Sequence, residues 1–76
     1  MAAVDEVPGT WQGLAADAQV RTMLRGLLRE QGSAGTDAEV EALCLDGDAG
    51  RIWAASRGDV QATLDLREWM GLPPFV

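Results

Sequence analysis

Side chains that commonly do chemistry are scarce in this sequence. It contains no histidine and no tyrosine, and all six of its basic residues are arginines, so it has no lysine. Without histidine it lacks the usual general base at neutral pH, the histidine-dependent nucleophiles and the common zinc and iron ligand sets. Without lysine it can form no Schiff base. We therefore expect a chain that is not catalytic by itself and holds no cofactor of its own.

Cys44 is the only cysteine, and two interpretations of it differ. A reactive thiol needs a neighbour that lowers its pKa, but no basic residue flanks Cys44, and Asp46 would raise the pKa. The sequence therefore favours a buried cysteine that packs as a small apolar side chain. A single cysteine allows no internal disulfide, and the acidic N-terminus lacks the apolar run of a signal peptide. Both features predict a cytoplasmic protein.

The segment around Asp46, Asp48 and Gly50 alternates in the manner of a calcium-binding loop. Its sixth position is Arg51, where such a loop requires glycine, and no glutamate stands at the twelfth. The sequence therefore predicts no calcium site, and Asp48 is expected to begin a helix. Asp-Gly between apolar runs also suits a hairpin, which is the alternative for this segment.

Three of the six arginines, Arg21, Arg25 and Arg29, recur every fourth residue on one face of a helix expected over 17–31. Such a row could hold an acidic partner, a carboxylate or a phosphate. It could also be a solvated face whose positive charge favours the helix C-terminus. Both interpretations remain open from the sequence.

The pattern of helix start and stop signals predicts an all-α fold, a small orthogonal bundle of three to four short helices. The side chains of Asp17, Thr36, Asp48 and Asp59 are of the types that begin helices, and Thr10 is expected to cap only a short turn. The alternative is an α+β arrangement, helix–hairpin–helix, with strands at 40–45 and 51–55. We expect a flexible arm over 1–9, a single helical domain over 10–72 and a proline-rich apolar tail over 73–76.

The last expected helix, which begins at Asp59 and ends before Gly71, carries too much apolar surface for so small a chain. Its apolar arc spans roughly 220°, interrupted only by Arg67, whereas a surface helix needs about 100°. We expect part of this excess to bind a partner. The candidate partner-binding residues are Trp53, Leu66, Trp69, Met70 and Phe75, together with the row of Arg21, Arg25 and Arg29.

The net charge of −6 argues against nucleic acid as that partner, because binding phosphates requires an excess of basic residues. No segment approaches the roughly 18 apolar residues of a membrane span. We therefore expect the partner to be a larger protein subunit or further copies of this chain.

The second half of the sequence resembles the small α subunit of two-subunit extradiol aromatic-ring dioxygenases of the protocatechuate 4,5-dioxygenase type. The resemblance is carried by Thr36–Leu43, Asp48, Ile52, Gly58–Val60, Leu64, Leu66 and Gly71–Leu72, with Leu14–Asp17 and Arg21 upstream. It implies an all-helical chain that packs against a larger subunit and covers its active site. It also implies that the iron and its ligands belong to that partner.

Two other functions fit the sequence. An acidic inhibitor or immunity-type protein would present its negative surface to a basic partner. The hairpin interpretation would instead resemble small head-completion proteins of tailed phages.

Overall fold

The computed structural model describes residues 6–74 and contains five helices within this range. They are α1 (Trp11–Ala16), α2 (Ala18–Glu30), α3 (Asp37–Asp46), α4 (Ala49–Ser56) and α5 (Val60–Trp69). No strand occurs in the described range, so the all-α prediction is confirmed and the helix–hairpin–helix alternative for 40–55 is wrong.

Each helix begins where a side chain accepts a hydrogen bond from the free backbone N–H groups of its first turn. Thr10, Asp17, Asp48 and Asp59 each accept from the residue three positions ahead. Thr36 and Glu39 form a reciprocal capping box. The sequence predicted all of these caps, because Asp and Thr side chains suit this role and Ala or Leu do not.

The number of helices exceeds the expected three or four because the turn after Thr10 is a complete short helix. The backbone N–H of Asp17 donates to the carbonyl of Leu14 and so closes α1. The extended backbone of Asp17 (φ −72°, ψ 128°) then changes the direction of the chain before α2 begins. One residue thus ends α1 and caps α2, which separates two helices where the apolar pattern alone suggested one helix and a turn.

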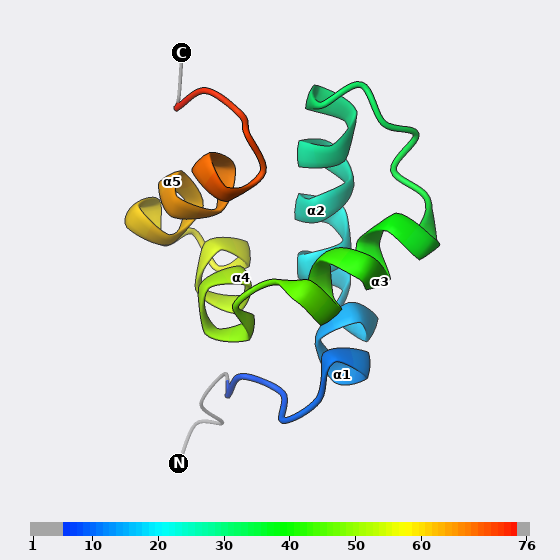
Figure 1. The fold of residues 1–76 in the computed structure, drawn as a ribbon. Helices are drawn as coiled ribbons and strands as arrows, with labels where there is room; N and C mark the ends of the chain where they lie inside the picture. The colour runs from blue at the N-terminus through cyan, green and yellow to red at the C-terminus, as the bar shows by residue number, and fades with distance from the viewer. Residues whose placement is uncertain (1–5, 75–76) are drawn as a thin grey trace.

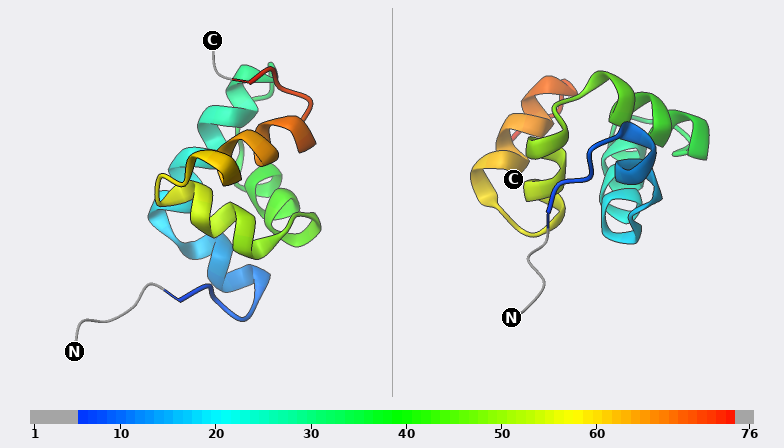
Figure 2. Two further views of the ribbon diagram at one scale, coloured as in Figure 1. Left: turned by 90° about the vertical axis from the view of Figure 1, so that its left-hand side faces the viewer. Right: turned by 90° about the horizontal axis from the view of Figure 1, so that it is seen from below.

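The helices pack as two groups that lie side by side (Figure 1). Helices α1, α2 and α3 contact one another and form one group, while α4 and α5 form a hairpin that packs beside this group, with α4 against α2 and α1. The two views in Figure 2 show α4 and α5 side by side along their lengths. The short turn over 57–59, with Gly58 at φ +95°, allows this reversal.

All five helices contribute to a single apolar core. Its fully buried large side chains are Leu14, Val20, Leu24, Val40, Ile52 and Leu66. Cys44 lies in the same core at 3% exposure, as the sequence predicted for a structural cysteine. Helix α5 inserts Leu66, and Met70, which caps its C-terminus, is also buried. By contrast, Val60 is 63% exposed and Trp69 is 48% exposed. The core of this chain therefore covers only part of the apolar surface of α5.

Gly47, between α3 and α4, gives a test of how tightly this core is packed. An added Cβ there would lie 2.8 Å from Ile52 Cδ1, 2.8 Å from the Leu43 carbonyl oxygen and 3.3 Å from Trp69 Cη2. We expect Gly47→Ala to lower the free energy of unfolding by about 1–3 kcal/mol through overpacking.

The matched control is Gly26→Ala, in the middle of α2, where an added Cβ meets nothing within 4 Å. The same change should there raise the free energy of unfolding by about 0.5–1 kcal/mol, because alanine is the better helix former. Urea denaturation of both variants measures the difference. Equal effects of the two changes would contradict close packing around Gly47.

Candidate functional site

The arginine row on α2 is mostly engaged within the chain. Asp37, the first residue of α3, accepts hydrogen bonds from both Arg21 and Arg25, the former at 3.3 Å. Arg29, one turn further on, is exposed. The row therefore pins α3 to α2 at two of its three positions, which leaves Arg29 as its only member outside this contact. This use was missed because Asp37 lies far from the row in sequence.

The thiol of Cys44 is poorly suited to reaction. Burial raises the pKa of the Cys44 thiol, and the charge of Glu41 raises it further. A higher pKa leaves less of the nucleophilic thiolate at neutral pH. The structure therefore gives the one cysteine a packing role.

Arg57 was not singled out in the sequence, yet it joins the α4–α5 turn to the start of α2. Its guanidinium donates to both carboxylate oxygens of Asp17, at 2.8 Å and 3.1 Å. It also donates to the Ser56 hydroxyl at 2.8 Å and lies 3.4 Å above the centre of the Trp53 ring. Asp17 thus caps α2 and holds Arg57 at the same time.

Arg67 makes the equivalent connection at the other end of α2. It is 5% exposed, and it donates to both carboxylate oxygens of Glu30, the last residue of α2, at 2.8 Å and 2.9 Å. Its Nε donates to the Pro73 carbonyl at 2.8 Å. Two arginines therefore fasten the α4–α5 hairpin to opposite ends of α2. We call these two contacts the Arg57–Asp17 clasp and the Arg67–Glu30 clasp.

A signal for the second clasp was present in the sequence. Arg67 is the one charge that interrupts the apolar arc of α5, and a charge on a buried helix face needs a partner. The sequence did not show which of the twelve acidic residues would supply it. That choice depends on how the helices cross, which local patterns do not determine.

The carboxylates that pair with arginines make the stability of the fold depend on pH in the acidic range. Hydrogen bonds from Arg57, Arg67 and Arg25 hold the pKa values of Asp17, Glu30 and Asp37 below the ordinary 3.8 for Asp and 4.5 for Glu. Groups with a lowered pKa in the folded state stabilise the fold above the pKa of the unfolded state. This stabilisation is lost as the pH falls through the folded-state values.

We therefore expect the urea midpoint to stay nearly constant from neutral pH to about pH 5 and to fall steeply below about pH 4. Arg67→Met should reduce the size of this fall, because Glu30 then loses the guanidinium that lowers its pKa. Glu68→Gln is the control, since no ion pair in the described range involves Glu68. A urea midpoint that does not change at acidic pH would contradict the conclusion that these arginine–carboxylate pairs stabilise the fold.

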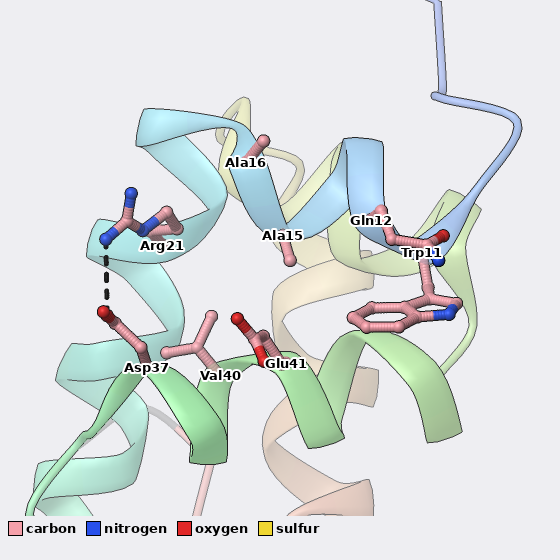
Figure 3. A pocket seen from close by; sticks show the side chains of 8 residues that line it. All are labelled: Trp11, Gln12, Ala15, Ala16, Arg21, Asp37, Val40 and Glu41. Atoms are coloured by element: carbon pink, nitrogen blue, oxygen red, sulfur yellow. Dashed lines mark hydrogen bonds and ion pairs between the residues drawn. The ribbon is translucent and has the colours of Figure 1, made fainter.

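A hollow of about 280 Å³ lies between α1, α2 and the start of α3 (Figure 3). The indole of Trp11 lies at one end above α3, and the Arg21–Asp37 pair closes the other end. Ala15 and Val40 lie between them, and Glu41 projects from α3. The charges of Arg21 and Asp37 in this hollow already neutralise one another. The hollow therefore offers no pair of free groups for acid–base chemistry.

A smaller hollow of about 130 Å³ lies beside Trp69, where the end of α3 and the start of α4 meet α5. We call it the Trp69 pocket, and its lining residues are Asp46, Gly47, Asp48, Arg51, Leu66 and Trp69. Trp69 reaches over Gly47 and leaves 48% of its surface exposed. This pocket combines an accessible indole with two carboxylates.

The candidate partner-binding residues of the last third are thus divided by the structure. Leu66 and Met70 are 2% and 8% exposed in the core, so a partner that binds the folded chain does not reach their side chains from solvent. Trp53 carries the Arg57 guanidinium on its ring face. Phe75 lies outside the described residues. Trp69 remains as the large exposed side chain among them.

Within residues 6–74, no group of three or more His, Cys, Asp or Glu side chains is arranged to hold a metal ion. None of the helices in this range combines the length and apolar composition that crossing a membrane requires. No family model, curated protein or solved structure matches the chain.

Proposed function

We propose that this chain is a non-catalytic accessory subunit that packs on a larger protein. The observation that carries the proposal is the 48% exposure of the large indole of Trp69 at the end of α5. Tryptophan is enriched among the residues that dominate the free energy of protein association. An indole held at a fixed position, over Gly47, loses little conformational entropy when a partner covers it.

The use of the charged groups supports a binding role over a catalytic one. Within the described range, five arginines pair with carboxylates of this chain: Arg21, Arg25, Arg51, Arg57 and Arg67. These pairs hold helices together and do not converge on one cavity. Cys44 is buried, and its thiol pKa is raised. The paired charges therefore stabilise the fold, and the thiol takes part in its core.

The specific partner in this proposal is the large subunit of a ring-cleaving dioxygenase, which would carry the iron. Support for it comes from the resemblance in residues 36–72 and from the all-helical fold. A cytoplasmic location belongs to the same proposal, since a single buried thiol suits a reducing compartment.

Light scattering on the chain purified from its native host without denaturation tests the proposal. The chain alone has a mass of 8.1 kDa, and we expect it to elute in a heavier assembly with one larger protein. Trp69→Ala should shift the chain to the monomer position, whereas Arg25→Ala should leave the assembly intact. A wild-type chain that is folded and elutes as an 8.1 kDa monomer would contradict an accessory role.

A further inference from the structure

The two carboxylates of the Trp69 pocket lack a cation of their own. No ion pair in residues 6–74 involves Asp46 or Asp48, and Asp48 uses one oxygen to cap α4. Arg51, the one basic residue that lines the pocket, has its Nε 3.8 Å from Asp65 Oδ2. The pocket therefore combines the exposed negative charge of Asp46 and Asp48 with the exposed indole of Trp69.

Asp46 also stands at an electrostatically unfavourable position. It is the last residue of α3, where the helix dipole is negative, and the last turn of α3 contains no basic residue. A carboxylate at this end costs stability unless a positive charge lies nearby. Residues that break a local rule without internal compensation are expected at functional sites.

We propose that the Trp69 pocket receives a positively charged side chain, arginine or lysine, from the protein partner. This inference rests on the proposed function and identifies the partner by its basic docking surface. The aliphatic part of the side chain packs on the exposed indole of Trp69, and its charged end lies between Asp46 and Asp48. A cation above the Trp69 ring gains a further attraction. The Arg57–Trp53 contact, at 3.4 Å, shows the same pairing inside the chain.

The surrounding charges favour such a partner over a second copy of this chain. Glu68 is exposed next to Trp69, and the whole chain carries a net charge of −6. A symmetric contact through the Trp69 pocket would bring Asp46, Asp48 and Glu68 of two copies together. Like charges placed opposite one another in an interface weaken it. The negative phosphates of a nucleic acid would be repelled by the same acidic side chains.

A titration with N-acetyl-arginine amide tests the inference on the purified 76-residue chain. The readout is the nuclear magnetic resonance signal of the Trp69 indole N–H, assigned with Trp69→Phe. We expect the arginine compound to shift this signal to saturation, and the uncharged N-acetyl-citrulline amide, of nearly equal shape, not to shift it. The double variant Asp46→Asn/Asp48→Asn should weaken the response at least tenfold. Asparagine caps helices as well as aspartate, so α4 keeps its start.

Glu41→Gln is the control. Glu41 lines the separate hollow between α1, α2 and α3, so this change should leave the response unchanged. An equal response to citrulline, no saturable response to arginine, or an unchanged response in the double variant would each overturn the inference. These results are distinct from failure of the proposed function. If Trp69→Ala breaks a native assembly while arginine gives no response, the accessory role stands and the cationic docking side chain is wrong.

Discussion

Replacing Asp17 with alanine is expected to lower the free energy of unfolding by about 2–4 kcal/mol. Loss of an N-cap costs about 1 kcal/mol, and loss of hydrogen bonds to a charged group costs about 1.5–3 kcal/mol. Asp17 makes both kinds of contact, since its carboxylate accepts from the Val20 N–H at 3.0 Å and from two nitrogens of Arg57. Its side chain is 22% exposed and that of Arg57 is 20% exposed, so water competes weakly.

Asp59→Ala is the matched control for this prediction. Asp59 caps α5 through the Ala62 N–H at 2.9 Å, and no ion pair in the described range involves it. Its loss should therefore cost only the cap, about 1 kcal/mol. The loss of unfolding free energy in Asp17→Asn should lie between those of Asp17→Ala and Asp59→Ala, because asparagine retains the cap but not the charge. Urea denaturation that gives equal losses for Asp17→Ala and Asp59→Ala would show that the Arg57–Asp17 clasp contributes nothing.

Replacing Trp69 with alanine is expected to weaken binding to the partner by at least about 2 kcal/mol, or roughly thirtyfold in Kd. The indole is the large apolar group of the Trp69 pocket, and its removal also takes away a wall against which a partner side chain packs. The fold should survive, because Trp69 is not among the buried side chains that form the apolar core. Calorimetry with the purified partner measures the change in Kd.

Arg25→Ala is the control for Trp69→Ala. Arg25 pairs with Asp37 on the surface, and Arg21 also contacts Asp37, so the contact between α2 and α3 persists without Arg25. Exposed ion pairs contribute little to stability. A larger loss of binding in Arg25→Ala than in Trp69→Ala would move the docking surface to the arginine row.

The helices were largely predictable from the sequence because their start signals are local. Each cap uses a side chain and a backbone N–H three residues apart, so Asp17, Thr36, Asp48 and Asp59 could be identified without knowledge of the fold. Gly32 and Gly71, at φ +88° and +77°, likewise stand where the helices were expected to end. The short α1 was missed because its six residues bury only Leu14, too few for a periodic pattern.

The long-range contacts were not predictable. The partners in the two clasps are 40 and 37 residues apart in sequence. Their pairing follows from the way the α4–α5 hairpin lies against α2. The width of the apolar arc on α5 was visible, but the sequence could not show that Leu66 and Met70 face inward and Trp69 outward. That division depends on the rotation of α5 about its axis.

Hydroxyl-radical footprinting of the chain, free and bound to its partner, tests the docking surface most directly. It measures the oxidation rate of each side chain, which falls when a partner covers that side chain. We expect the oxidation rate of Trp69 to fall at least tenfold in the complex. Trp11, which lines the hollow between α1, α2 and α3, should retain its rate. An unchanged rate at Trp69 in a fully formed complex would contradict the proposal that this chain docks through the end of α5.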